Sequence, residues 1–521
     1  MEVAFGASLS GKRSCCCMKH VGLNVAADPL FTMSYTGVNG GLVICVADDP
    51  GMHSSQNEQD SRHYAIASKI PMLEPADSQE AKEFTKIAFE LSEQFDTPVL
   101  LRMCTRIAHS QCSVELVEPL SATKKEYVKN PQKFIMAPAN AIRRHPVVEK
   151  RTADLVAFAE TSPLNRIEEG TDKSLGIITS GTCYDYVKEV FGNSVSVLKL
   201  GLVNPLPVEK IKTFAASVER VVVLEELDPV IETHCKALGI KVDGKNMFSI
   251  CGEFSQKMIA DAFGIKTNSF TENSAPVPVR PPVMCAGCPH RGLFYILSKN
   301  KYTVLGDIGC YTLGSAAPLN AIDSVLCMGA SVSGLHGFNK ANQTENKTVC
   351  VIGDSTFMHS GMTGLANIAY NGTNSTVIIV DNSITGMTGH QQNPTTGYNI
   401  KGDPATKIDL EALCKALGIN RVRVIDPYDL KESEKVIKEE MAVNEPSVII
   451  SRRPCALLKT VKAKPALIID ADKCRSCKAC MRIGCPAISM KNSKATIDAT
   501  LCVGCGVCEQ LCAFSAIGGT K

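Results

Sequence analysis

The chain has 521 residues, 24 cysteines, no tryptophan and a formal net charge of +2, and 45% of its residues are hydrophobic. This composition is ordinary for a globular protein with a large core, and the length indicates roughly three or four domains. The near balance of 55 basic and 53 acidic residues argues against nucleic acid as a partner, and the lack of any run of 18 apolar residues argues against a membrane span.

Apolar runs alternate with amphipathic helical patterns along most of the chain, which is typical of α/β units with parallel strands. Strands, several of them followed by a turn and a helix, are expected within residues 42–51, 97–104, 174–192, 220–239, 348–372, 375–390, 422–427 and 446–455. Boundaries are indicated by a Pro- and Ser-rich stretch at 271–285 and by residues 135–172, which lack a clear period. We predict four units, at 1–140, 150–272, 280–460 and 465–521.

Polar residues follow two neighbouring apolar runs in the third unit. Gly353, Asp354 and Ser355 follow one run, and Asn382 ends the next, 28 positions after Asp354. The carboxyl end of a parallel sheet is where ligands bind, and Mg²⁺ prefers oxygen ligands together with phosphates. Gly353 allows a diphosphate to approach backbone N–H groups. The alternative is an ordinary turn capped by the Asp side chain.

The cysteines are distributed unevenly, since sixteen are scattered over the first 455 residues and eight fall between Cys474 and Cys512. Secreted disulfide proteins are small and spread their bridges through the chain, and residues 1–20 lack the segment order of a signal peptide. We therefore expect a reducing cytoplasm, in which the eight C-terminal cysteines bind metal.

These eight cysteines form two runs with two-residue gaps. Such gaps place three thiolates on one cubane, and the fourth cysteine of each run normally binds the other cluster. Zinc sites instead use separated pairs or Cys with His. We expect two [4Fe–4S] clusters, one on Cys474, Cys477, Cys480 and Cys512, and the other on Cys485, Cys502, Cys505 and Cys508. Residues 465–521 resemble bacterial two-cluster ferredoxins, with an α+β fold, although Ala513 replaces the usual proline.

The remaining motifs resemble one family. Residues 353–355 with Asn382 resemble the thiamine-diphosphate motif, with Ser355 in place of a glycine. Together with CAGCPHRG (285–292), GDIGCYTLG (306–314), CMGASVSGLHGF (327–338) and the cysteine runs, they resemble the α subunits of indolepyruvate ferredoxin oxidoreductases over essentially the whole chain. The resemblance implies a pyrimidine-binding-like domain first, a transketolase C-terminal-like domain second and a diphosphate-binding domain third.

The resemblance also implies a reaction and partners. The family converts arylpyruvates and CoA into aryl-acetyl-CoA and CO₂ and reduces ferredoxin, together with a smaller β subunit in an αβ or α₂β₂ assembly. It implies that Asp354, Asn382 and the Ile384 carbonyl hold Mg²⁺, and that Gly353, Ser355 and Gly329 contribute to the thiamine diphosphate site. The family's activating glutamate precedes the helix that starts here at Glu2, so we expect this chain to begin after it and to be impaired in catalysis.

A loop within residues 46–65 supplies candidates for the substrate carboxylate, namely His53, Gln56, Asn57 and Arg62. Arg62 is favoured because a guanidinium binds a carboxylate through two hydrogen bonds. The alternative is a solvated polar loop.

A third cluster is a further hypothesis. Related 2-oxoacid oxidoreductases bind a cluster near thiamine through cysteines that correspond to Cys285, Cys288 and Cys310. Cys455 is a candidate for the fourth ligand, and Cys414 is a weaker one. The alternative is a set of reduced thiols packed as small apolar side chains. Cys15, Cys16 and Cys17 depart from the helix residues that are usual in the family at this point, and we assign them no function.

Two other functions stay open. A non-redox thiamine-dependent decarboxylase or ligase leaves the eight terminal cysteines unexplained. An electron-transfer subunit without catalysis accounts for those cysteines and for an incomplete thiamine site.

Overall fold

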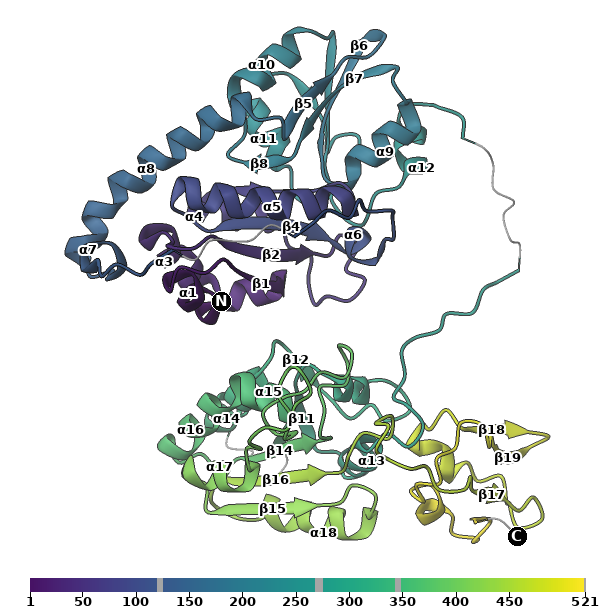
Figure 1. Cartoon of the computed structure of the whole chain (residues 1–521). Helices are drawn as coiled ribbons and strands as arrows, with labels where there is room; N and C mark the ends of the chain where they lie inside the picture. The colour runs from purple at the N-terminus through teal and green to yellow at the C-terminus, as the bar shows by residue number, and fades with distance from the viewer. Residues whose placement is uncertain (120–124, 268–274, 343–347, 520–521) are drawn as a thin grey trace. The chain divides into compact units, whose positions relative to one another are not determined.

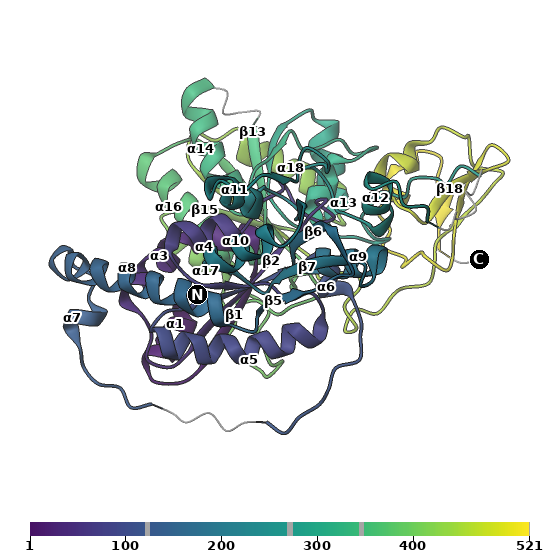
Figure 2. The ribbon, with the colours of Figure 1, turned by 90° about the horizontal axis from the view of Figure 1, so that it is seen from above.

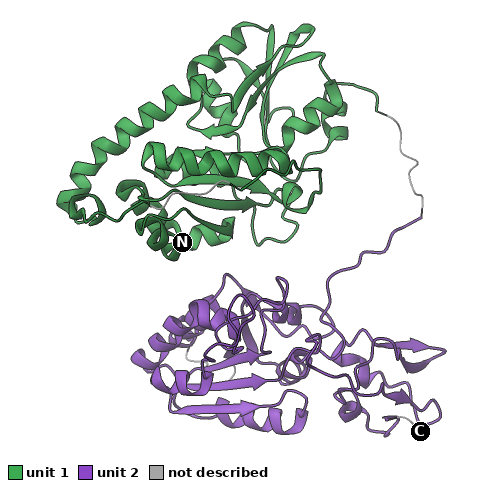
Figure 3. Ribbon diagram, viewed as in Figure 1, with its two compact units in different colours: residues 1–273 green, residues 274–521 purple. Residues whose placement is uncertain are grey.

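The computed structural model describes residues 1–119, 125–267, 275–342 and 348–519. The chain divides into two compact units, residues 1–273 and 274–521 (Figure 3). The division falls inside the Pro- and Ser-rich stretch, and the finer division into four units stays a prediction. Among the helices that the structure describes, none is both long and apolar enough to cross a bilayer.

The first sheet of unit 1 has the order β1-β2-β4-β3-β8. Its strands β2 and β4 are almost entirely buried and rich in Val, Leu and Ile, which is typical of central parallel strands. The strands are β1 Ser14–Lys19, β2 Leu42–Asp48, β3 Met72–Leu73, β4 Val99–Cys104 and β8 Leu202–Asn204. The helices are α1 Glu2–Leu9, α2 His20–Val25, α3 Ala27–Thr36, α4 Arg62–Ser68, α5 Ser78–Phe95, α6 Thr105–His109, α7 Pro131–Phe134 and α8 Pro138–Thr161 (Figure 1).

The second sheet of unit 1 has the order β10-β9-β6-β7-β5, and only β5 runs antiparallel to its neighbour. The strands are β5 Asn165–Glu168, β6 Asp172–Ser180, β7 Val195–Leu200, β9 Arg220–Leu224 and β10 Val242–Asp243. The helices are α9 Thr182–Phe191, α10 Val208–Ala216, α11 Val230–Ala237 and α12 Gln256–Ala262. The strand-turn-helix patterns expected at 174–192 and 220–239 are therefore confirmed.

Two segments of unit 1 differ from expectation. Cys15, Cys16 and Cys17 lie in the edge strand β1 and not in a helix, because this segment pairs in parallel register with β2. Residues 138–161, where no period was recognised, form the 24-residue helix α8. Its buried residues Val148, Arg151, Leu155 and Ala159 follow helical spacing, so α8 runs through the boundary expected between residues 140 and 150.

Unit 2 contains a six-stranded parallel sheet of order β12-β11-β13-β14-β16-β15. The strands are β11 Thr303–Gly306, β12 Ser324–Val325, β13 Thr348–Gly353, β14 Thr376–Asp381, β15 Arg421–Ile425 and β16 Ser447–Arg452. The helices are α13 His290–Lys299, α14 Ala330–Asn342, α15 Asp354–Thr356, α16 Met362–Asn371, α17 Leu410–Ala416 and α18 Leu430–Met441. The four strands expected between residues 348 and 455 are confirmed.

The cysteine-rich C-terminal segment packs beside α13 (Figure 2). It has two short antiparallel strand pairs, β17 Ile468–Ile469 with β20 Ile517–Gly518 and β18 Ile488–Lys491 with β19 Lys494–Ile497. Two 3₁₀ turns, Ala479–Ile483 and Glu509–Leu511, complete it.

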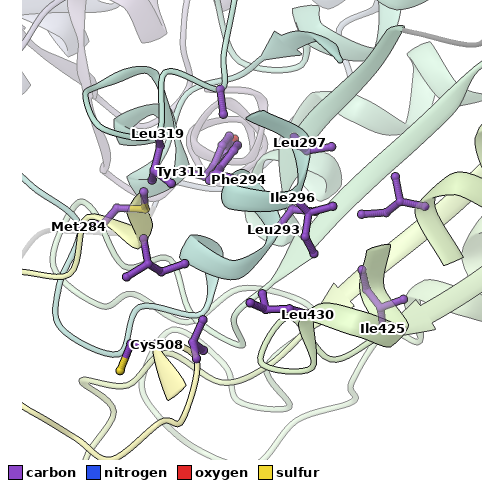
Figure 4. Close-up of a cluster of buried hydrophobic side chains, with 14 of the residues drawn as sticks. Met284, Leu293, Phe294, Ile296, Leu297, Tyr311, Leu319, Ile425, Leu430 and Cys508 are labelled. Atoms are coloured by element: carbon purple, nitrogen blue, oxygen red, sulfur yellow. The ribbon is translucent and has the colours of Figure 1, made fainter. Parts of the chain in front are cut away.

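Helix α13 connects this segment to the sheet through one hydrophobic core. Leu293, Phe294, Ile296 and Leu297 are all fully or almost fully buried, and their cluster continues from the sheet to Cys508 (Figure 4). A segment of this size has only a small core of its own, so packing against α13 adds to its stability.

Candidate functional site

The carboxyl ends of β13 and β14 bring the predicted magnesium ligands to one edge of the sheet. The strands pair in parallel with Gly353 opposite Val380, so Asp354 and Asn382 each follow directly at the same end. Both side chains are buried. The two side chains therefore lie at the same end of the sheet.

Asp354 is a buried acid that pairs with no cation among the residues the structure describes. Its Oδ2 accepts hydrogen bonds from Thr395 Oγ1 at 3.2 Å and from Asn393 Nδ2 at 3.4 Å. Burial, and then the neighbouring carboxylate of Asp381, raises the pKa of Asp354 to about 7. A buried carboxylate without a counter-ion is costly, and a bound cation would remove that cost. The site therefore fits Mg²⁺.

The loop after β14 bends tightly around Asn382. Ser383 has a positive φ of 59°, and the amide of Ile384 donates to Asn382 Oδ1 at 3.3 Å. A Cβ placed on Gly386 would lie 3.6 Å from Cys310 Sγ and 3.9 Å from Asn382 Nδ2. The Cys310 thiol therefore lies close to the predicted magnesium loop.

Asp307 organises the neighbouring loop, and no role was assigned to it from the sequence. Its carboxylate is fully buried and accepts from the amides of Gly329 at 3.0 Å and Ser331 at 3.1 Å, at the start of α14. Gly329 has a φ of +88°, and a Cβ there would meet Ser360 Oγ at 2.6 Å. Asp307, Asn393 and Thr395 thus support the site, and they were not identified from the sequence. Asp307 lies within the segment GDIGCYTLG, which could have drawn attention to it.

Four cysteines from distant segments of unit 2 gather near this edge. Burial, together with the nearby Cys285 and Cys455 thiols, raises the pKa of Cys288 to about 12. Burial also raises the pKa of Cys310, and Cys455 and Cys285 add to that shift. Cys414, in contrast, is fully buried in a separate core cluster on α17. The structure thus favours Cys455 over Cys414 as the fourth member of this set.

The C-terminal cysteines lie in two groups of neighbouring thiols. Burial raises the pKa of Cys480, with contributions from the Cys477, Cys474 and Cys512 thiols. A cavity is lined by those same four cysteines.

The second group contains Cys485, Cys502, Cys505 and Cys508. Burial raises the pKa of Cys508 to about 12, with contributions from Cys505, Cys485, Cys502 and Cys480. Cys480 belongs to the first group, so the two groups adjoin each other.

No set of three or more His, Cys, Asp or Glu side chains in the described ranges is placed to hold a single metal ion. A zinc ion draws four thiolates to about 2.3 Å around one centre. A cubane separates its thiolates more widely, because each binds a different iron. It is the spacing of the cysteines along the chain that favours cubanes over zinc.

The substrate candidates of unit 1 are divided between surface and interior. His53, Gln56 and Asn57 are exposed, and His53 Nε2 lies 3.2 Å from Glu253 Oε2. Arg62 is buried instead, and the structure gives it a different set of partners from the one expected.

Arg62 directs its guanidinium to protein acceptors. It donates to the carboxylates of Asp60 at 2.6 Å and Glu225 at 2.5 Å, and to the carbonyls of Glu226 at 3.0 Å and Asp228 at 2.9 Å. These contacts support a structural role, and its binding of a substrate carboxylate stays a prediction.

The parallel sheet of unit 2 and the site at the carboxyl ends of β13 and β14 indicate the class of protein. Residues 307–451 match the family model of the C-terminal TPP-binding domain of thiamine pyrophosphate enzymes. This range contains Asp307, Gly329, Asp354 and Asn382.

Curated relatives then give the particular family. Indolepyruvate oxidoreductase subunit IorA of Archaeoglobus fulgidus is 38% identical, with 100% of this chain and 88% of that protein covered. The protein of the same name from Thermococcus kodakarensis is 39% identical, with the same coverage. The chain therefore belongs to the family of indolepyruvate oxidoreductase subunit IorA, and it is an oxidoreductase. A solved 2-oxoglutarate:ferredoxin oxidoreductase from Magnetococcus marinus aligns at 20% identity with a TM-score of 0.41, covering 50% of this chain and 55% of that one.

Proposed function

We propose that this chain is the α subunit of an enzyme that oxidatively decarboxylates arylpyruvates, indolepyruvate among them, with CoA. The products are aryl-acetyl-CoA and CO₂, and the electrons pass through [4Fe–4S] clusters to ferredoxin. The observation that carries the proposal is the hydrogen bond from the Cys455 amide to the Asn382 carbonyl, at 2.9 Å. It holds one member of the cysteine set beside the proposed magnesium loop, and a reaction that couples decarboxylation to electron removal needs a redox centre near the thiamine.

In this proposal Asp354, the Asn382 side chain and the Ile384 carbonyl hold Mg²⁺, while Gly353, Ser355 and Gly329 border the diphosphate. When bound, thiamine diphosphate supplies the carbanion chemistry that takes up the electrons left by CO₂ loss. The chain's own residues orient the cofactor and exclude water. Support comes from the burial of Asp354 and Asn382 and from the Asp307 carboxylate, which holds the loop that begins α14.

We further propose a third cluster on Cys285, Cys288, Cys310 and Cys455. This cluster would lie next to the thiamine site and receive electrons first, and the two C-terminal clusters would receive them afterwards. A Cβ on Gly287 would lie 2.1 Å from Val503 Cγ2, so the loop of Cys285 and Cys288 touches the loop of Cys502 and Cys505. This contact supports an electron route from the third cluster to the Cys485 group and on to the Cys480 group.

The partners in this proposal are a smaller β subunit, in an αβ or α₂β₂ assembly, and a ferredoxin as electron acceptor, in the cytoplasm. The exposed His53 and the buried Arg62 remain the candidates for contact with the substrate.

The direct test is anaerobic absorbance spectroscopy of the assembled α and β subunits. Addition of indolepyruvate and CoA should bleach the broad iron–sulfur absorption within turnover time, and ferredoxin should restore it. CO₂ release without bleaching would instead support a non-redox thiamine decarboxylase. Reduction of the clusters by dithionite, with neither CO₂ release nor bleaching by substrate, would support an electron-transfer subunit.

A further inference from the structure

Arg291, in the first turn of α13, joins two cysteine loops that are about 200 residues apart in sequence. Its side chain is 4% exposed. It donates to the carbonyls of Cys285 at 3.0 Å and of Met284, in the loop of Cys285 and Cys288. It also donates to the carbonyls of Ile483 at 3.1 Å and Gly484 at 2.5 Å, immediately before Cys485. One guanidinium therefore holds both loops.

The charge of Arg291 has no carboxylate partner within the described part of the chain, because all four of its acceptors are backbone carbonyls. The loops that it joins carry cysteines of both sets, Cys285 and Cys288 on one side and Cys485 on the other. A buried cation without compensation is strongly unfavourable. The negative charge that compensates Arg291 would come from the two proposed clusters together.

Glycines lie where the two loops are closely packed. A Cβ on Gly484, whose φ is +66°, would lie 3.2 Å from Arg291 Nη1. On the other loop, Gly287 has a φ of +67° and contacts Val503, and its carbonyl accepts a hydrogen bond from the Tyr428 hydroxyl. Each loop thus has a glycine at a position where a larger residue would be strained and would meet a neighbouring side chain.

We propose that Arg291 is the shared counter-ion of the two neighbouring clusters, a positioning residue that favours their reduced forms and thereby matches their potentials for electron transfer. The inference rests on the proposed clusters. Each reduction adds one negative charge, and a fixed buried cation lowers the free energy of that added charge. Arg291 itself gains or loses neither proton nor electron. An electron that passes between the two clusters would oxidise one and reduce the other, and the charge of Arg291 would not change.

The test is an EPR-monitored potentiometric titration of the anaerobically purified protein with its β subunit. Arg291→Gln should lower the one-electron reduction equilibrium constant of both neighbouring clusters about tenfold, which is about 59 mV. Arg291→Lys keeps the charge and should stay within about threefold of the wild type. Arg482→Gln is the matched control, since Arg482 directly precedes Ile483 but is exposed and screened by solvent.

Iron content makes each outcome decisive. Full iron in Arg291→Gln with midpoints equal to those of Arg482→Gln would overturn the proposal. If Arg291→Gln loses iron, the Arg291→Lys variant decides the question. Full iron and wild-type midpoint potentials in Arg291→Lys support the counter-ion role. Lowered midpoint potentials at full iron, or loss of iron in this variant too, overturn it. About eight irons in the wild type instead of about twelve would contradict the third cluster of the proposed function. The shift at the Cys485 group would still be measurable in that case, so the two failures are distinguishable.

Discussion

The backbone of Cys455 is hydrogen-bonded to the backbone of Asn382, at 2.9 Å from N to O. The two residues follow neighbouring strands, because β14 and β16 pair in parallel with Asp381 opposite Arg452. The chain continues this pairing past the strand ends, since the Arg453 amide also donates to the Asp381 carbonyl at 3.0 Å. The position of a candidate cluster ligand is thereby determined by the same ladder that positions a candidate magnesium ligand.

Replacing Cys455 with Ala should remove the third cluster alone. We expect iron to fall from about twelve to about eight atoms per chain, at four irons per cubane, because three cysteines do not complete this ligand set. Colorimetric iron analysis of anaerobically purified protein measures this. Cys414→Ala is the control and should retain all twelve, since Cys414 is buried in another core. A loss of four irons in Cys414→Ala, with none in Cys455→Ala, would contradict the assignment.

Replacing Asp354 with Asn should weaken the binding of Mg²⁺-thiamine diphosphate by about 100-fold or more. Loss of a supporting residue already costs about 10–100-fold in metal affinity, and loss of a ligand costs at least as much. Isothermal titration calorimetry with the cofactor and Mg²⁺ gives the dissociation constant. Asp403→Asn, at an exposed position of the same unit, should bind normally. Equal affinities in the two variants would exclude Asp354 as a ligand.

The stability of unit 1 should fall as pH rises, because of Glu226. Burial raises the pKa of Glu226 from 4.5 to about 7. Between these values the folded carboxyl keeps its proton while the unfolded one has lost it, so the stabilisation present below pH 4.5 is lost by about pH 7. The loss is on the order of 3 kcal/mol.

Hydrogen exchange of the β9 amides at several pH values measures this dependence. Glu226→Gln should flatten it, whereas Glu209→Gln, at an exposed position on α10, should leave it unchanged. A slope that persists in Glu226→Gln would show that another group is responsible.

Replacing Arg62 with Ala should destabilise unit 1 by about 3–5 kcal/mol, because the carboxylates of Asp60 and Glu225 would remain buried and unpaired. Hydrogen exchange of the β2 amides reports the change. Arg106→Ala is the control, since Arg106 is exposed and its ion pair with Glu253 should contribute about 1 kcal/mol or less.

The same variant tests the role of Arg62 predicted from the sequence. A raised KM for the arylpyruvate would support substrate binding. An unchanged KM together with lowered stability would show that Arg62 acts only on the fold.

Much of unit 2 could be predicted from the sequence because its signals are local. Four apolar runs between Thr348 and Arg452 form strands where expected, and polar residues follow two of them. Short cysteine spacings likewise predict the two C-terminal groups, since residues three positions apart in a tight loop can reach one cluster. In unit 1, helix α8 was missed because its buried face begins only near Val148, after a stretch with mixed polarity.

The sequence by itself determined the strand-to-loop units and the resemblance that the family match confirms. Only the tertiary structure placed the Cys455 backbone against Asn382 and Cys414 in a separate core, buried Arg62 away from solvent, and brought Arg291 between two cysteine loops. The physical reason is sequence distance. Strand pairing and core packing join residues that are tens to hundreds of positions apart, and no local spacing encodes which of them meet.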